Sequence, residues 1–312
     1  MPRVEIDGLT KDYRVGSFSR KTKRALDHLT LSITEGEIFG LIGPNGAGKT
    51  TTLKLLMGLV FPTEGHAQIL GKPLGDLSMK AEIGYLPEQP YFYDYLTGRE
   101  LLDYFGRLFG MSGDERRQRS QELLRRVDLT AAADLQLRKY SKGMTQRLGV
   151  AQALLNRPRV VFLDEPMSGL DPMGRRDMTL LIRELNQEGA TVLFCSHILP
   201  DVEALCDRVA ILNQGRQVKA GRLSEILDLS LTIEVVLDRV SEDLERKLSR
   251  MSKRLQRLGK GVKLELENDE ILGNVLGLVQ TNGARLVSVH PVRQTLEEYF
   301  VREVESAGVE KA

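Results

Sequence analysis

A glycine-rich segment between an apolar run and a helical run constrains this chain more than any other stretch. Residues 38–52 read IFGLIGPNGAGKTTT. Because glycine has no side chain, successive backbone N–H groups in such a turn can close around phosphate oxygens at a helix N-terminus. Lys49 would bridge the outer phosphates, and the Thr50 hydroxyl would be a ligand of Mg²⁺. The spacing predicts a strand, a phosphate-binding turn and a helix, rather than a chance glycine-rich loop.

Length and charge bound the other possibilities. The chain has 312 residues, enough for about two domains, since domains usually run to ~100–200 residues. Its 44 lysines and arginines balance 43 acidic residues. Bulk charge therefore gives no reason to expect a nucleic-acid partner.

Cysteine usage and hydropathy favour a protein of the reducing cytosol. Cys195 and Cys206 form no CxxC pattern, so neither a disulfide framework nor a zinc site is indicated. The N-terminus lacks the apolar core of a signal peptide, and no run approaches the ~20 apolar residues of a membrane helix. We expect the chain to be soluble by itself.

Two strongly apolar runs after the glycine-rich turn end in polar side chains. Residues 160–163 precede Asp164 and Glu165, residues 191–195 precede Ser196 and His197, and a helical pattern at about 174–187 separates them. Such runs are typical of buried parallel strands, whose carboxyl ends face the ligand crevice of an open sheet. There Asp164 could hold Mg²⁺, Glu165 could activate a water for attack on the γ-phosphate, and His197 could contact that phosphate or be structural.

The segment before the glycine-rich turn offers an aromatic side chain and a basic run. Alternating apolar residues at 4–9 and 29–33 predict antiparallel strands. Tyr13, between them, either stacks on an adenine ring or packs at a strand end. The basic run is a solvated loop or a binding patch. It contains Arg14, Arg20, Lys21, Lys23 and Arg24.

A helical period over residues 97–130 predicts a mostly helical insertion. Its entry, residues 90–96, reads PYFYDYL, and clustered aromatic side chains suit a protein interface as well as internal packing. Farther along, residues 140–146 read YSKGMTQ, in which Ser141 is a suitable N-cap. The chain thus offers a second helix N-terminus that could face a phosphate.

In this order the motifs resemble those of the nucleotide-binding subunit of ABC transporters, over about residues 3–220. By this resemblance Tyr13 is the adenine-stacking aromatic, and Walker A comprises Gly43, Pro44, Asn45, Gly46, Ala47, Gly48, Lys49, Thr50 and Thr51. Gln89 matches the Q-loop glutamine, residues 141–144 the signature and 160–164 Walker B. Glu165 matches the catalytic glutamate, residues 168–171 the D-loop and His197 the switch histidine.

The resemblance implies an ATPase that binds ATP and Mg²⁺. Thr50, Gln89 and Asp164 would hold the metal, while Glu165, His197 and Gln89 would carry catalysis. Two copies would form a head-to-tail homodimer around two ATP molecules. Ser141, Gly143 and Asp171 would then complete the site that begins at the partner's Walker A.

The resemblance also implies a membrane partner. The helical insertion and the aromatic segment after Gln89 would receive a coupling helix from a transmembrane permease, and the chain would lie peripherally on the cytoplasmic face of the membrane. The usual signature is LSGGQ, whereas residues 140–144 read YSKGM. This variant resembles the ATPases of drug, sodium, polysaccharide and gliding-type exporters. Lys142 adds a cation that the helix dipole disfavours but a facing phosphate would favour.

The expected architecture is an α/β P-loop NTPase cassette at residues 1–222, with a mixed sheet core, an antiparallel β subdomain and a helical subdomain at about 90–155. A small α+β domain of ferredoxin-like type would occupy residues 223–312. Strands are expected at 231–237, 262–267 and 285–289, and helices at 242–258, 270–281 and 295–305. The basic helix at 242–258 could touch anionic headgroups or have a solvated face.

Two other functions compete with transport. A non-transport ABC ATPase acting on ribosomes or DNA usually carries two cassettes or a long coiled-coil insertion, and neither is evident here. An unrelated GTPase or small-molecule kinase would share the P-loop but leave Gln89, Ser141, Asp171 and His197 unexplained. The leading hypothesis is the ATPase subunit of an exporter.

Overall fold

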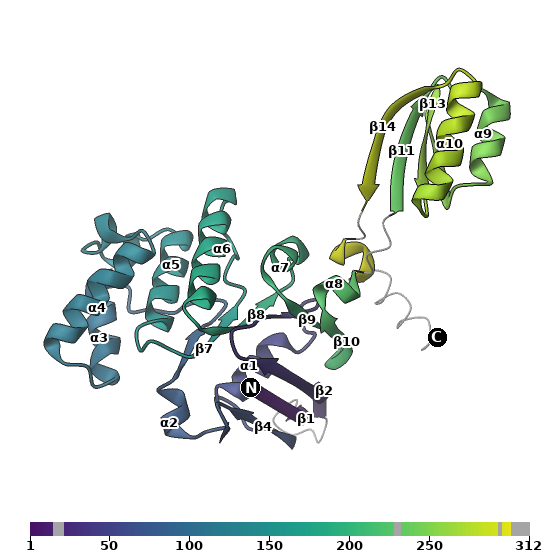
Figure 1. Cartoon of the computed structure of the whole chain (residues 1–312). Coiled ribbons are helices and arrows are strands. Elements are labelled where there is room, and N and C mark those ends of the chain that lie inside the picture. The colour runs from purple at the N-terminus through teal and green to yellow at the C-terminus, as the bar shows by residue number, and fades with distance from the viewer. Residues whose placement is uncertain (15–21, 228–231, 293–294, 301–312) are drawn as a thin grey trace. The chain divides into compact units, whose positions relative to one another are not determined.

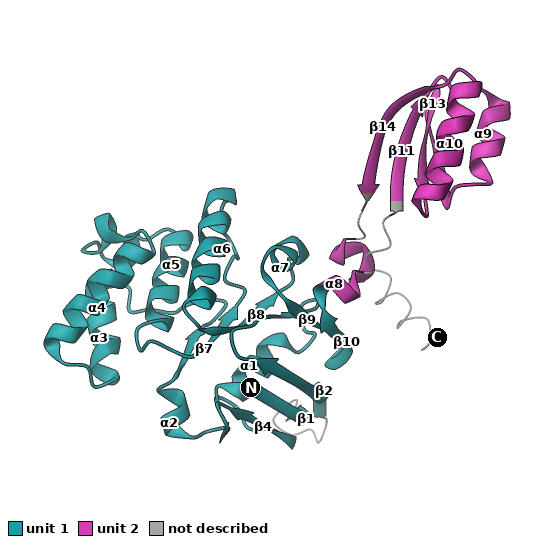
Figure 2. Cartoon of the chain, in the orientation of Figure 1, with its two compact units in different colours: residues 1–223 teal, residues 224–312 magenta. Residues whose placement is uncertain are grey.

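The computed structural model describes residues 1–14, 22–227, 232–292 and 295–300. The chain divides into two compact units, Met1–Leu223 and Ser224–Ala312 (Figure 2). Each unit has its own cluster of buried apolar side chains.

A six-stranded sheet forms the centre of the first unit (Figure 1). In sheet order its strands are β10 (Arg216–Arg222), β9 (Arg208–Asn213), β3 (Ile38–Ile42), β8 (Thr191–Ser196), β7 (Val160–Asp164) and β6 (Ile83–Leu86). The strands from β9 to β6 are parallel to their neighbours, and β10 is antiparallel to β9. Every residue of β3, β7 and β8 is buried, which explains their continuous apolar sequences.

Helices connect the parallel strands, so their carboxyl ends meet at one edge of the sheet. Helix α1 (Lys49–Leu56) follows β3, α6 (Pro172–Gln187) joins β7 to β8, and α7 (Leu199–Leu205) joins β8 to β9. The expected α/β cassette is thereby confirmed.

Both cysteines lie inside this unit. Cys195 is in β8 and Cys206 follows α7; each thiol is free and buried. Burial penalises the thiolate and raises the pKa of both thiols above the ordinary value.

A second, antiparallel sheet packs on the same core. Its order is β2 (Thr22–Thr34), β1 (Pro2–Arg14), β4 (Glu64–Ile69) and β5 (Lys72–Pro73). The strands expected at 4–9 and 29–33 are confirmed as parts of β1 and β2. Leucines and isoleucines from this sheet share one buried cluster with β3, α1 and β7, so the two sheets and α1 fold as one body.

The insertion between β6 and β7 is mostly helical, as expected. It contains α3 (Gly98–Leu108), α4 (Gly113–Arg126) and α5 (Lys142–Ala153), while the short α2 (Leu77–Lys80) precedes β6 (Figure 1). Side chains fix where the three longer helices begin. The hydroxyls of Thr97, Ser112 and Ser141 each accept a hydrogen bond from a backbone N–H in the first turn of the helix that follows.

The second unit has the strand order β12-β13-β11-β14. It is built from β11 (Thr232–Asp238), α9 (Glu242–Ser249), β12 (Arg254–Leu258), β13 (Gly261–Leu266), α10 (Asp269–Thr281) and β14 (Arg285–Val292), after the short α8 (Leu223–Ile226) at the junction between the units. A βαββαβ order with the two central strands β13 and β11 antiparallel is ferredoxin-like, which confirms that prediction.

The helix expected at residues 242–258 is wrong beyond Ser249. Residues 254–258 instead form β12, which pairs antiparallel with β13. The leucines in this segment have a helical spacing, but residues 254–258 pair with a neighbouring strand instead. Such pairing is a tertiary effect, which local sequence propensity does not predict. Lys253, Arg254 and Arg257 therefore lie outside the helix, and the proposed basic helical face does not exist in that form. Of the last expected helix, residues 296–300 are helical and 301–305 lie outside the described residues.

The second unit should lose stability when its central core leucine is shortened. Leu264 of β13 has 0% of its surface exposed, so Leu264→Ala should cost about 2–5 kcal/mol of unfolding free energy. Leu258→Ala in β12 is the control, because Leu258 is 47% exposed and its loss should cost little. Calorimetry of the full chain should show one transition moving down with Leu264→Ala. Equal shifts for both variants would contradict this account of the core.

Candidate functional site

The glycine-rich turn lies between β3 and α1, with the N-terminus of α1 at the carboxyl edge of the central sheet. A Cβ at Gly43 would sit 2.3 Å from the carbonyl oxygen of Leu212 in β9, so no larger residue fits there. Gly48 has a φ of 111° and precedes Lys49, the first residue of α1. Glycine at these places lets the loop curl against the sheet while the helix N–H groups stay open.

A pocket of about 510 Å³ opens over this turn. It is lined by Tyr13, Lys23, Arg24, Ala25, Pro44, Asn45, Gly46, Ala47, Gly48, Lys49, Thr50, Thr51, Glu88 and Glu165. Walker A, apart from the packed Gly43, thus faces one cavity together with residues of β1, β2 and β7's end. This size falls within the usual range for small-ligand pockets, about 300–1,000 Å³.

The Lys49 ammonium lies buried at the floor of the pocket, with 6% of its side chain exposed. Its Nζ donates to the Gly43 carbonyl oxygen at 2.7 Å and lies 3.6 Å from Glu165 Oε1. A buried ammonium needs such partners, because desolvation of an isolated charge is costly. A nucleotide phosphate would offer the same ammonium a stronger acceptor.

Glu165 is held in a conformation that few non-glycine residues adopt. Its φ is 50°, and its side chain is 8% exposed. Nδ1 of His197 lies 2.8 Å from its Oε1, and Ser196 donates to its Oε2 at 3.3 Å. Buried Gln146 of α5 also reaches the Glu165 backbone carbonyl, at 3.5 Å. Left-handed backbone at a site of this kind is a recurrent feature of functional residues.

Asp164, the last residue of β7, is a buried carboxylate with room for a cation. It is 1% exposed, and neither oxygen accepts a well-formed hydrogen bond from any described residue. Burial raises its pKa to about 6; the nearby Thr50 hydroxyl opposes the rise, and Glu165 and Glu88 add to it. An unsatisfied carboxylate beside a phosphate-binding turn fits the oxygen-rich coordination that Mg²⁺ prefers.

Tyr13 lies at the edge of the same pocket, near the end of β1. It is half-buried, and the Nζ of Lys11 lies 5.2 Å from its ring centroid. Lys23 of β2 is its partner across the two strands. The ring therefore lines the same pocket as the glycine-rich turn.

Seven predicted residues do not line this pocket: Gly43, Gln89, Ser141, Gly143, Asp164, Asp171 and His197. Asp164 and His197 lie beside it, next to Glu165 in the sequence and at its carboxylate respectively. Gln89 is exposed and accepts a hydrogen bond from the Tyr91 hydroxyl at 2.9 Å. Ser141 caps α5, with its Oγ accepting from the Met144 N–H at 3.2 Å. Asp171 caps α6 in the same way. Gly143 packs toward Leu170, within the same segment as Asp171. Within one chain, the side chains of Ser141 and Asp171 thus serve as N-caps of α5 and α6.

Sequence reasoning missed four lining residues as site residues: Lys23, Arg24, Ala25 and Glu88. Glu88 could have been found, because it follows β6 at the same edge of the sheet as Asp164. Lys23 and Arg24 belong to the basic run for which a binding patch was one interpretation, and Arg20 and Lys21 of that run lie outside the described residues. Which residues of β2 face the pocket depends on the register between β1 and β2.

Over residues 1–14, 22–227, 232–292 and 295–300, no three His, Cys, Asp or Glu side chains converge as a metal cluster. In the same ranges, every helix is too short or too polar to cross a bilayer.

Comparison with known proteins agrees with this geometry. Residues 26–168 match the ABC transporter family. A Synechocystis protein, named as an uncharacterized ABC transporter ATP-binding protein, is 44% identical over 312 residues, covering 98% of this chain and 86% of that protein. The Nod factor export ATP-binding protein I of Cupriavidus metallidurans is 37% identical over 213 residues, covering 68% of this chain and 70% of its own.

A solved structure shares the cassette. The ATP-binding cassette MJ0796, seen as a dimer in a post-hydrolysis state with ADP and Pi, has a TM-score of 0.65 at 30% identity and covers 70% of this chain and 98% of its own. Relatives that are this similar over nearly the full length, together with the shared cassette, leave one assignment. The chain belongs to the ATP-binding subunits of ABC transporters, and its cassette is an ATPase.

Proposed function

We propose that this chain hydrolyses ATP with Mg²⁺ to drive export of a substrate through a separate membrane subunit. The observation that carries the proposal is the convergence of Lys49, Asp164 and Glu165 at the carboxyl ends of β3 and β7, under a pocket lined by Walker A. Export is supported by a relative whose name is Nod factor export ATP-binding protein. The cytoplasmic face of the membrane is where such a subunit would meet both ATP and its partner.

Each residue would have a distinct task in hydrolysis. Lys49 would leave the Gly43 carbonyl for the phosphates, and the N–H groups of α1 would bind their oxygens. Thr50 and Asp164 would hold Mg²⁺, which supplies charge neutralisation for the transferred phosphoryl group. Once Lys49 moves, Glu165 Oε1 would be free to accept a proton from the attacking water, with His197 orienting the carboxylate.

A second copy of the chain would complete the site. Ser141, Gly143 and Asp171 lie away from the pocket in their own subunit, at the starts of α5 and α6. Placed against the pocket of a second copy, the N-terminus of α5 would offer its N–H groups to the γ-phosphate. The dimeric assembly of the MJ0796 cassette supports this arrangement.

The helical region carries a surface suited to the membrane subunit. Tyr93, Tyr95 and Tyr104 are 51%, 61% and 38% exposed, with ring centroids 5.8 Å apart for the first pair. They line a cavity of about 770 Å³ together with Arg99 and Arg107. Tyrosine and arginine are the residue types enriched where proteins bind one another.

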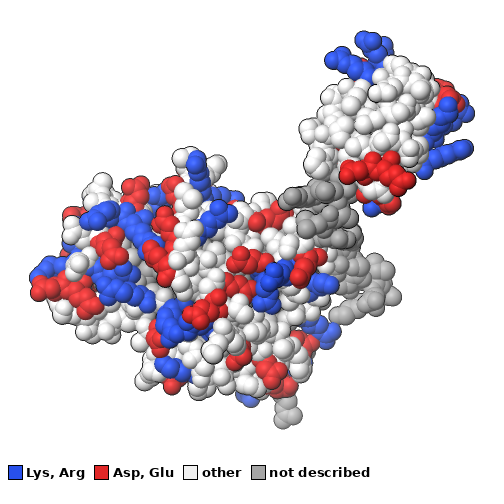
Figure 3. All heavy atoms as spheres, in the orientation of Figure 1, with Lys and Arg blue, Asp and Glu red and all other residues white. Residues whose placement is uncertain are grey.

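Action on nucleic acid has less support. On the face displayed in Figure 3, basic and acidic side chains are interspersed over the first unit. Nucleic-acid binding by backbone phosphates uses a continuous basic surface, which this face does not offer.

Removing the proposed base should stop turnover without preventing ATP binding. Glu165→Gln keeps the shape of the side chain but cannot accept the proton, so kcat should fall by about 100-fold or more. ATP should then hold the chain as a dimer in size-exclusion chromatography. Glu184→Gln, at an exposed part of α6, should leave kcat unchanged. Hydrolysis by Glu165→Gln at the rate of the unaltered protein would eliminate Glu165 as the base.

The metal-free protein should become more stable when Asp164 is made neutral. Its pKa is raised from 3.8 to about 6, so the folded state resists ionisation, and stability falls as pH rises from about 4 through 6. Asp164→Asn should therefore stabilise the protein in chelator by about 1–3 kcal/mol at pH 8, with the gain shrinking toward pH 4.5. Denaturant titrations at both pH values test this. If Asp164→Asn were less stable than the unaltered protein at pH 8 without metal, burial would not be the cause of the raised pKa. We also expect Asp164→Asn to lose Mg²⁺-dependent ATP binding.

The membrane partner can be captured directly. Tagged Glu165→Gln protein with ATP, purified from detergent-solubilised native membranes, should bring down a multi-span membrane protein identified by mass spectrometry. Adding Tyr93→Ala and Tyr95→Ala should reduce recovery severalfold, whereas adding Leu77→Ala, at an 81% exposed position, should not. Recovery of ribosomes or DNA-bound proteins in place of a membrane protein would replace the transport proposal with the non-transport one.

A further inference from the structure

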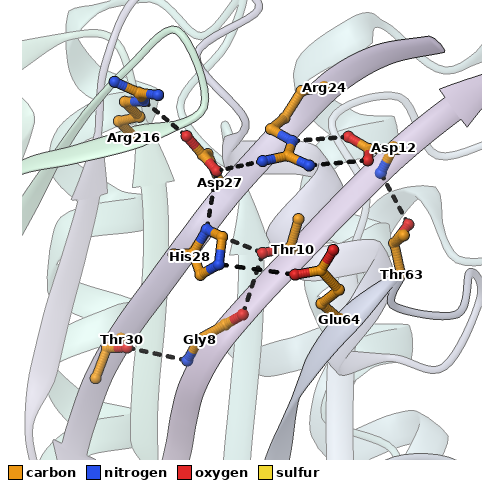
Figure 4. Close-up of polar contacts among 10 residues, drawn as sticks. All are labelled: Gly8, Thr10, Asp12, Arg24, Asp27, His28, Thr30, Thr63, Glu64 and Arg216. Carbon is orange, nitrogen blue, oxygen red and sulfur yellow. Dashed lines mark hydrogen bonds and ion pairs between the residues drawn. The ribbon is translucent and has the colours of Figure 1, made fainter.

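A carboxylate on β2 gathers three cationic or hydrogen-bonding side chains beside the nucleotide pocket (Figure 4). Asp27 accepts from Arg24 Nη1 at 2.9 Å and from Arg216 Nε at 2.7 Å, and its Oδ1 lies 2.9 Å from Nδ1 of His28. Its side chain is only 11% exposed. These contacts, first that of His28 and then that of Arg216, hold the pKa of Asp27 well below its usual range, so the carboxylate is charged at neutral pH.

A local irregularity of β2 turns Asp27 toward β10. His28 has a φ of 51°, and its N–H donates to Oγ1 of the buried Thr10 on β1 at 3.0 Å. The pairing of β1 with β2 changes register between Leu9 and Lys11, opposite this point. An irregularity of this kind re-aims side chains on the bulged strand.

The backbone around Asp27 is tied to Walker A. The Asp27 N–H donates to the Gly215 carbonyl at 2.8 Å, and the Gly215 N–H donates to the Ala47 carbonyl at 3.0 Å. A Cβ at Gly48 would lie 2.9 Å from the Ala25 carbonyl oxygen, and one at Gly215 would lie 3.0 Å from the same atom. The backbones of three segments are therefore in direct contact, with no space for side chains between them: the phosphate-binding turn, the β9–β10 turn and β2.

The other side of the cluster is tied to the strand end that bears Tyr13. Arg24 donates to both oxygens of Asp12, at 2.9 and 3.1 Å, and these residues are cross-strand partners next to the pair Tyr13 and Lys23. The Asp12 N–H donates to Oγ1 of Thr63 at 3.0 Å. A two-pronged arginine–carboxylate contact fixes relative orientation as well as distance.

Arg24 lines the pocket, but its charge is already matched. Its Nε and Nη2 bond Asp12 and its Nη1 bonds Asp27. A guanidinium neutralised by two carboxylates is a poor phosphate ligand, but it can hold the two carboxylates at a fixed distance from each other. Arg24 therefore braces the wall of the pocket beside Tyr13 rather than offering it a free charge for an anion.

We propose that Asp27 is a positioning residue that sets the distance between Tyr13 and Walker A, and so determines how tightly the adenine end of the nucleotide is held. The chain of contacts runs from Ala47 through Gly215 to Asp27, and from there through Arg24 and Asp12 to the strand end of Tyr13. This inference rests on the proposed role of Tyr13 in adenine stacking. Asp27 touches no nucleotide itself.

The test compares ATP with magnesium tripolyphosphate, which has the phosphates but no base. Asp27→Asn keeps the size of the side chain and removes the charge that binds Arg24 and Arg216. Its dissociation constant for ATP should rise about 5- to 150-fold, the range of a lost base stack, while that for tripolyphosphate changes less than about twofold. Asp7→Asn is the matched control, because Asp7 is 72% exposed on the same strand β1 as Tyr13. It should leave both constants unchanged.

A double-mutant cycle separates positioning from general damage. Tyr13→Ala should weaken ATP binding as much as Asp27→Asn does. The combined variant should bind ATP no more weakly than Tyr13→Ala alone. Additive losses, or an equal loss for tripolyphosphate, would overturn the inference. If Tyr13→Ala leaves ATP affinity unchanged, Tyr13 does not stack on adenine, and the proposed positioning role of Asp27 is wrong with it.

A second variant covers the case in which Asp27→Asn does not fold. Arg24→Gln breaks the same chain of contacts at a side chain that is 43% exposed, so it should be tolerated. It should show the same selective loss of ATP over tripolyphosphate. Unchanged ATP affinity in Arg24→Gln would likewise overturn the proposal.

Discussion

The burial of one ammonium group, that of Lys49, is the constraint on which this cassette depends. Lys49 lies at the floor of the pocket, where its Nζ donates to the Gly43 carbonyl oxygen and lies 3.6 Å from Glu165 Oε1. Parallel strands make this possible, because β3 and β7 end at the same edge and bring a lysine and two carboxylates together. Under the proposed function, these are the contacts that Lys49 would exchange for phosphate oxygens.

Motif spacing predicted the centre of the site because its parts are local. A strand, a turn and a helix place Walker A whatever the rest of the chain does, and β7 and β8 were recognisable from continuous apolar runs ending in Asp164, Glu165 and His197. The sequence left Arg24 in a basic run that was either a solvated loop or a binding patch. It could not decide between the two, because which residues of β2 face the pocket depends on the register between β1 and β2. The extended helix expected at 242–258 failed for a related reason: residues 254–258 find a strand partner that spacing alone does not reveal.

The ferredoxin-like unit illustrates the limits of fold as a guide to function. Its topology is established by β11, α9, β12, β13, α10 and β14, yet many unrelated functions share this topology. Among its described residues, the open side of the sheet carries ion pairs such as Lys263 with Glu234 rather than a catalytic arrangement. The chemistry of this chain is concentrated in the first unit, where backbone strain at Glu165 and an unpaired carboxylate at Asp164 coincide.

The burial of both cysteines has a practical side. Thiol reagents attack the thiolate, and Cys195 and Cys206 are enclosed in the first unit with raised pKa values, so neither is in the reactive form or within reach of a bulky label. The native cysteines should therefore not react with labels used in site-directed spectroscopy. A single cysteine introduced on an exposed helix could carry a fluorophore or spin label, and the proposed association of two copies could be tested without first removing the native thiols.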